Sequence, residues 1–128
     1  MKKSILFMAV ATIVFLTLNS CSKDDAPGGT YTIQYKLVGS PGVVISNAVY
    51  ATDGTGGMET RSNIGSQNFE TDVFTFANDG YPSMSCNATG PNNNSTLKAQ
   101  IFKNGKLLKE STATGEILVI SVSGAGSN

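Results

Sequence analysis

Apolar and polar residues alternate along most of the chain after its first 30 residues. In the segment 31–37 the odd-numbered residues are Tyr, Ile, Tyr and Leu, and the even-numbered ones are Thr, Gln and Lys. A period of two is typical of a β-strand with one buried face, whereas a helix repeats every 3.6 residues. Turn-forming residues such as Pro41-Gly42 and Asn78-Asp79-Gly80 separate these segments. The pattern predicts a series of short strands.

The clearest turn is Asn104-Gly105, between two of these segments. Both central residues of a type I′ turn need a positive φ, which Asn and Gly adopt readily, so a hairpin is expected here. The last segment, 117–123, is almost continuously apolar, which predicts a strand covered on both faces. The weakest alternation is in 58–64. The predicted strands are 31–37, 43–51, 58–64, 69–76, 83–88, 97–103, 106–112 and 117–123.

Two antiparallel sheets packed face to face bury one side of every such strand. We therefore predict an all-β fold, a small immunoglobulin-like β-sandwich of seven or eight antiparallel strands over residues 31–123. A small closed barrel is the alternative. The last residues, 124–128, are Gly-Ala-Gly-Ser-Asn and are expected to fray.

The N-terminal region has a different pattern. Lys2-Lys3 precedes fourteen uncharged residues, from Ile5 to Leu18. A membrane-spanning helix needs about 20 apolar residues, whereas the apolar core of a secretory signal peptide is shorter. Residues 1–20 are therefore expected to be a signal peptide that is removed.

The end of this segment, Leu18-Asn19-Ser20-Cys21, resembles a bacterial lipobox. The resemblance implies that diacylglycerol is attached to the thiol of Cys21 and that signal peptidase II cuts between Ser20 and Cys21. Each buried lipid methylene contributes about 0.8 kcal/mol, so two or three chains would hold the protein on a membrane. An uncleaved anchor, or an ordinary secretory signal in which Cys21 is incidental, is the alternative.

Residues 21–30 are expected to form a lipidated cysteine and a flexible tether, because they contain Pro27 and Gly28-Gly29 but no apolar run. Lys23-Asp24-Asp25 resembles the short acidic export signals of surface lipoproteins in the Bacteroidota. That resemblance implies an outer-membrane lipoprotein exposed at the cell surface. The alternative is that both aspartates are solvated tether charges.

Composition narrows the chemistry further. The 128 residues include no His and two Cys, and the formal net charge is zero. The chain therefore lacks the commonest general base and metal ligand, and nothing in its charge suggests a nucleic-acid partner. Its length is that of one domain.

Individual candidates for chemistry have structural explanations. Cys86 alternates with apolar neighbours, so a place in the core is expected. Asp53, Asp72 and Asp79 are not spaced as in a calcium-binding loop and are expected to form turns. We therefore predict no catalytic residue, no metal, no cofactor and no enzymatic activity.

Two segments carry a family resemblance. Tyr31-Thr32-Ile33-Gln34-Tyr35-Lys36-Leu37-Val38-Gly39 and the hairpin 97–111 are similar to small Bacteroidota lipoproteins related to the MmpS-like transport accessory family. The similarity covers about Tyr31 to Ser123. It implies a membrane-tethered β-sandwich and, from the family's actinobacterial members, a role beside large exporters. This chain lacks the family's central Trp and has Ala99 where one disulfide Cys is expected.

These observations predict a lipid-anchored, non-enzymatic envelope lipoprotein that acts as a binding or accessory module for an unknown protein partner. Recognition would use the loops Thr52–Gly57 and Gly90–Ser95, or an exposed sheet edge that adds a partner strand. One alternative is an accessory subunit of an envelope exporter. Another is an adhesin or glycan-binding protein. Sugar-binding surfaces favour flat exposed aromatic rings, and the chain has no Trp and four Tyr, so an exposed cluster of Tyr31, Tyr50 or Tyr81 would be needed to support this alternative.

Overall fold

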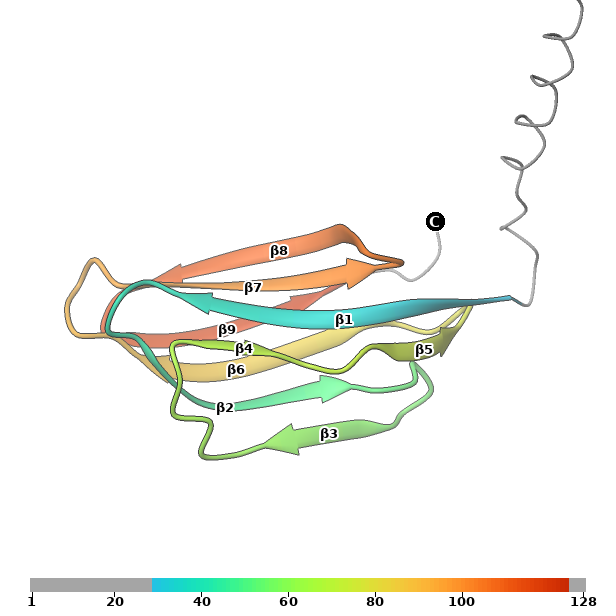
Figure 1. Cartoon of the computed structure of the whole chain (residues 1–128), viewed down its shortest axis with the longest axis horizontal. Helices are drawn as coiled ribbons and strands as arrows, with labels where there is room; N and C mark the ends of the chain where they lie inside the picture. The colour runs from blue at the N-terminus through green and yellow to red at the C-terminus, as the bar shows by residue number, and fades with distance from the viewer. Residues whose placement is uncertain (1–28, 125–128) are drawn as a thin grey trace, which may run out of the picture.

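Nine β-strands and no helix make up residues 29–124, the part of the chain that the computed structural model describes (Figure 1). The strands are β1 (Thr30–Gly39), β2 (Val44–Ala51), β3 (Met58–Arg61), β4 (Asn68–Glu70), β5 (Phe74–Ala77), β6 (Ser83–Thr89), β7 (Thr96–Lys103), β8 (Lys106–Thr114) and β9 (Ile117–Ser123).

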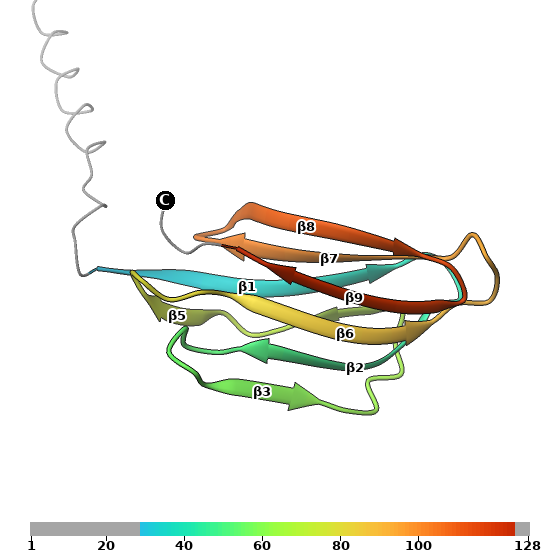
Figure 2. The ribbon, with the colours of Figure 1, turned by 180° about the vertical axis from the view of Figure 1, so that it is seen from behind.

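The strands form two antiparallel sheets. Sheet A has the order β4-β1-β7-β8, and β5 also pairs with β1. Sheet B has the order β3-β2-β6-β9. Figure 1 looks onto sheet A and Figure 2 onto sheet B, and the two layers pack face to face. The predicted all-β sandwich is confirmed, and the closed-barrel alternative is wrong because no strand ladder in the described range joins the two sheets.

One predicted strand, 69–76, is in fact two strands, which raises the number from seven or eight to nine. The break lies at Thr71, whose hydroxyl accepts the N–H of Tyr35 at 3.1 Å in place of a backbone carbonyl. The same hydroxyl donates to the carbonyl of Asp72 at 2.7 Å. A side chain therefore replaces part of the ladder to β1, and the backbone leaves the sheet before β5 begins.

The third predicted strand, 58–64, is shorter than expected. β3 ends at Arg61, and Asn63 and Gly65 follow with φ of 54° and 64°. A positive φ is incompatible with extended strand geometry, so the backbone turns here.

The prediction that β9 is covered on both faces is wrong. Leu118, Ile120 and Val122 face the core and are buried, but Ile117 and Val119 are 78% and 66% exposed. β9 forms the edge of sheet B, and within residues 29–124 no third layer covers the outer face of that sheet. Its outward apolar residues are therefore a surface feature.

The core is a continuous layer of inward-facing side chains from both sheets. Its largest members are aromatic: the rings of Tyr35 and Tyr50 lie 5.5 Å apart between centroids, and those of Tyr50 and Phe74 lie 5.9 Å apart. Tilted pairs at these distances contribute about 0.5–1.5 kcal/mol beyond the burial of their surface. The aromatic cluster therefore joins β1, β2 and β5.

A buried hydroxyl connects the two sheets directly. The Tyr35 hydroxyl, on β1 of sheet A, donates to the carbonyl of Ala51 on β2 at 2.9 Å. It also accepts the N–H of Ser83, the first residue of β6, at 3.2 Å. Four residues upstream on β1, the Tyr31 hydroxyl donates to the carbonyl of Gly80 at 2.7 Å. These bonds hold β1 against the end of β2, the start of β6 and the connection between β5 and β6.

The hairpin between β7 and β8 turns at Asn104-Gly105, as predicted. Both residues have a positive φ, 50° and 83°, as a type I′ turn requires. Asn104 is also tied to β1, because its side-chain oxygen accepts the N–H of Thr32 at 2.9 Å. Its own N–H donates to the carbonyl of Thr32 at 2.9 Å.

Tyr35→Phe is expected to lower the free energy of unfolding by about 1–3 kcal/mol, because it leaves the Ala51 carbonyl and the Ser83 N–H without their partner. Urea unfolding followed by circular dichroism measures the loss. Tyr81→Phe is the matched control, since Tyr81 is 64% exposed and its loss should change stability little. Equal stability of the two variants would show that the hydroxyl bridge contributes nothing.

Candidate functional site

The sandwich has two distinct ends. One end is where β1 begins at Thr30, and we call it the tether-proximal end because the tether is predicted to precede this strand. It holds the loop 52–57, the turn 78–80 and the hairpin turn 104–105 (Figure 1). The distal end holds the connections 40–43, 62–67, 90–95 and 115–116. The two loops predicted to carry function, 52–57 and 90–95, therefore lie at opposite ends of the domain and cannot form one site.

The tether-proximal loop is shaped by an aspartate. The Asp53 carboxylate accepts the N–H of Thr55 at 2.8 Å and that of Gly57 at 3.0 Å. These hydrogen bonds favour the ionised carboxylate and lower the pKa of Asp53. Asp53 is thus a turn former, as predicted. Gly54 has a φ of +78° and packs against Gly80, where a side chain would collide with backbone.

The distal loop is held by its own polar groups. Ser95 is buried, and its hydroxyl accepts the N–H of Asn92 at 3.2 Å. The Asn92 side-chain oxygen accepts the N–H of Asn94 at 2.8 Å. The N–H of Gly115 donates to the carbonyl of Ser95 at 2.9 Å, which ties the loop to the β8–β9 connection. The loop is therefore pre-organised without a ligand.

This loop presents amides to solvent. Pro91, Asn92, Asn93 and Asn94 are all exposed. Pro91 rests on Gly42, which has a φ of +89° and would bring a side chain to within 2.8 Å of the proline ring. Each Asn offers both donors and acceptors, so the distal end can bind a polar, uncharged surface such as a peptide backbone or hydroxyl groups.

Cys86 lies in the core, as predicted. Its side chain is 3% exposed, and burial raises the pKa of the thiol to about 11. A thiol with that pKa is a poor nucleophile at neutral pH.

No group of three or more His, Cys, Asp or Glu side chains within residues 29–124 is placed to hold a metal ion. The same part of the chain contains no helix long and apolar enough to cross a bilayer. Asp72 and Asp79 lie apart, before β5 and in the turn after it.

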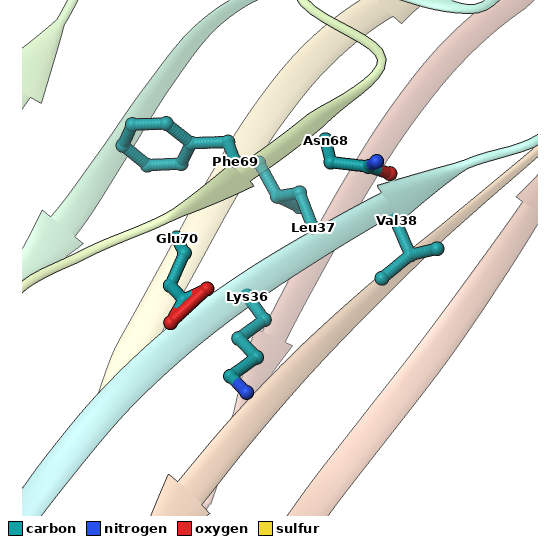
Figure 3. Close-up of a pocket in the computed structure, with 6 residues that line it drawn as sticks. All are labelled: Lys36, Leu37, Val38, Asn68, Phe69 and Glu70. Carbon is teal, nitrogen blue, oxygen red and sulfur yellow. The ribbon is translucent and has the colours of Figure 1, made fainter.

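An open hollow of about 400 Å³ lies over the edge of sheet A, between β1 and β4 (Figure 3). Its two charged side chains are already engaged by neighbours in the sheet. The Lys36 ammonium lies 4.8 Å from the ring centroid of Phe102, and the Glu70 carboxylate accepts a hydrogen bond from the Gln34 amide at 3.2 Å. The hollow is a shallow surface feature with satisfied charges, not a built ligand site.

Within the described part of the chain, Tyr31, Tyr50 and Tyr81 do not form the exposed aromatic cluster that would support glycan binding. Tyr31 and Tyr50 are 4% and 1% exposed, so their rings belong to the core. Tyr81 is exposed, but the rings of Tyr31 and Tyr50 do not join it on the surface. The adhesin alternative therefore loses the cluster on which it depended.

The predicted lipobox residues Leu18, Asn19, Ser20 and Cys21 lie outside the described residues, as do Lys23, Asp24 and Asp25. Within the described residues, 29–124, the sequence analysis missed two features. One is the buried Ser95 that organises the distal loop, and the other is the outward apolar face of β9. The strict alternation of burial along β9 was hidden in the sequence, because both of its faces are apolar.

No protein-family model matches this chain, and no curated protein matches it. The function is therefore inferred from the residues themselves.

Alkylation of Cys86 is expected to be very slow in the folded protein at pH 7.5 and fast after unfolding in urea. Burial and the raised pKa, about 11, both oppose formation of the reactive thiolate. Mass spectrometry after iodoacetamide treatment, with and without urea, measures the difference. Rapid labelling in the folded state would place the thiol outside the core.

Proposed function

We propose that the protein is a lipid-anchored, non-enzymatic lipoprotein of the bacterial outer membrane that presents a β-sandwich as a binding module. The observation that carries this proposal is the position of β1. It begins at Thr30, so only residues 22–29 separate the predicted lipidated Cys21 from an all-β body. A segment of that length reaches at most about 30 Å.

The anchor would set the orientation of the domain. With lipid attached before β1, the tether-proximal end faces the membrane and the distal end faces away from it. The pre-organised loop 90–95 with its exposed asparagines then forms the outermost recognition surface. Pre-organisation favours binding because little conformational entropy is lost when the partner arrives.

The sequence of the predicted tether supports display at the cell surface. Lys23-Asp24-Asp25 would act as the export signal that places the lipoprotein on the outer leaflet, with its partner an envelope or extracellular protein.

A binding role is also supported by what the candidate chemical groups do. Asp53 holds a turn through two backbone N–H groups, and the Cys86 thiol is buried among core residues. These groups are used for structure, which fits a module that recognises a partner and leaves chemistry to others.

Cys21→Ser is expected to abolish both lipid attachment and cleavage between Ser20 and Cys21, because the modified sulfur is what signal peptidase II recognises in a lipobox. The full-length precursor should then accumulate without lipid. Intact mass spectrometry of membrane fractions measures both changes. Cys86→Ala is the matched control and should be processed normally. An unchanged mature mass for Cys21→Ser would contradict the proposal.

A second candidate, an accessory subunit of an envelope exporter, is favoured by one observation. The two segments that resemble the MmpS-like family form three adjacent strands, β1, β7 and β8, of one sheet. This role predicts that the native lipoprotein co-purifies with an exporter subunit from solubilised envelopes. Tagged protein carrying Cys21→Ser is the control for non-specific recovery. Recovery of the lipoprotein alone would exclude the accessory role.

A further inference from the structure

The edges of the two sheets differ in how well they are protected. β3, at one edge of sheet B, has only four residues and carries Glu59 and Arg61. The edge of sheet A beside β1 is divided into the short strands β4 and β5. Charges, short length and interruptions are the usual features that prevent an edge from adding a further strand.

β9 has none of these features. Its seven residues, Ile-Leu-Val-Ile-Ser-Val-Ser, include no charge and no proline, and its ladder to β6 is regular. In the described range it pairs only with β6, so its other side presents backbone N–H and C=O groups. Ile117 and Val119 are exposed on its outer face. β9 is thus an edge ready to accept a strand.

Beside β9, sheet A extends farther than sheet B by its edge strand β8. We call this offset between β8 and β9 the step. β9 packs against both β7 and β8, and both views show β8 at the margin of the molecule, beyond β9 (Figures 1 and 2). The core-facing residues of β7 are fully buried, whereas Ser111 and Ala113 on the core side of β8 are only half-buried. The inner face of β8 is therefore incompletely covered.

We propose that this step is the interface of a twofold dimer, in which the β8 strand of a second copy lies beside β9 and under β8. A twofold axis parallel to the strands makes the step self-complementary. The rotation places sheet A of the second copy in the same layer as sheet B of the first copy, and the reverse. Each overhanging β8 therefore fills the space beside the other copy's β9. The contact is isologous and closed, and each sheet A continues into the partner copy's sheet B.

The strand directions fit this arrangement. β8 runs from the hairpin turn 104–105 towards the distal end, and β9 runs back towards the tether-proximal end. A rotation about an axis parallel to the strands preserves these directions. The second copy's β8 is therefore antiparallel to β9, which is the pairing that both sheets already use.

The side-chain pattern also fits. Within one chain the two ends of β8 lie at the same positions along the strand direction as the two ends of β9. The turn at Gly115 joins the strands at one end, and Gly124 packs against Leu108 at the other. At the same level in the dimer, Val119 lies opposite Thr112 of the other copy and Ile117 lies opposite Thr114. Cross-strand pairs of β-branched residues stabilise antiparallel sheets by about 0.2–1 kcal/mol each. No like charges meet across this ladder.

A direct pairing of β9 with a second β9 is excluded by the same step. Antiparallel β9 strands in one sheet require a twofold axis perpendicular to that sheet. Because β8 projects beyond β9, such an axis would bring the two copies of sheet A into the same space. The shape of the step thus selects the arrangement in which β8 and β9 interlock.

The charged residue on the inner side of β8 lies where it can remain hydrated. Lys109 lines a hollow of about 390 Å³ at the tether-proximal end of the step, together with Tyr81, Pro82, Ser83, Ser123 and Gly124. Its exposed ammonium can reach water through this opening, so the two copies of Lys109 need not be buried against each other.

The dimer deepens the proposed function, and this step rests on it. An axis parallel to the strands places both tether-proximal ends on the same side, so two lipidated Cys21 residues reach one membrane. Both distal loops then face away from it. Confinement to a membrane raises the effective concentration of the copies and favours their pairing.

The test uses the full chain in native membranes with the double substitution Thr112→Cys/Val119→Cys. Both positions are exposed, and they lie on the outer faces of opposite sheets, so a disulfide between them cannot form within one chain. Mild oxidation is expected to shift the main band on a non-reducing gel to twice the mass of the single chain. Reduction should reverse the shift.

Lys98→Cys/Val119→Cys is the matched control. Lys98 pairs with Thr112 and lies one strand farther from the interface, on the same outer face. It should give no dimer band. Equal cross-linking of the two double variants, or none in either, would overturn the proposal. A cross-link to a different protein would also overturn it, by showing another occupant beside β9.

The unsubstituted chain provides two independent readouts. Light scattering of the detergent-solubilised protein is expected to show two chains per particle, and a single chain would overturn the dimer. Oxidation of the same protein should give no covalent dimer, because Cys86 is buried and Cys21 carries lipid. A dimer formed through Cys21 would contradict the proposed lipidation and leave the comparison of the double variants intact.

Discussion

The position of one buried hydroxyl determines how the two sheets meet. Tyr35 lies in the middle of β1, and its hydroxyl bonds to backbone groups of β2 and β6 in the opposite sheet. A buried hydroxyl without partners costs about 1–3 kcal/mol, so the sheets cannot slide past each other without losing both bonds. The aromatic rings around Tyr35 add packing that depends on the same alignment. The relative position of the sheets is therefore specified by polar geometry as well as by burial.

Three further properties of the described residues are relevant to function. The sheets are offset, which leaves β8 extending past β9 and creates a step at the margin. The loops separate into a tether-proximal group and a distal group, so that the asparagine-rich loop 90–95 is far from the start of β1. The thiol of Cys86 and the carboxylate of Asp53 are engaged in packing and turn formation. The described residues thus form a domain with β1 beginning at one end, the asparagine-rich loop at the other end, and the uncharged strand β9 at one edge.

Local sequence signals predicted the strands well where one face is apolar and the other polar. The segment 31–37, the Asn104-Gly105 turn and the buried Cys86 all followed from spacing of two or from a preferred φ. The prediction of a single strand over 69–76 was wrong because the Thr71 side chain replaces a backbone partner of Tyr35. This contact joins residues 36 positions apart, which the local pattern does not reveal. The prediction that β9 is covered on both faces was wrong because an apolar outer face has the same sequence pattern whether protein or solvent lies against it.

The sequence by itself determined the alternation that commits each segment to a strand and the turns between segments, because those depend on neighbours a few residues away. It also contains the lipobox-like motif on which the proposed anchor rests. Only the tertiary structure decided which strands are edges, which loops share an end, and where the step between β8 and β9 lies. These properties depend on pairing between segments far apart in the chain, and that pairing is set by packing of the whole core.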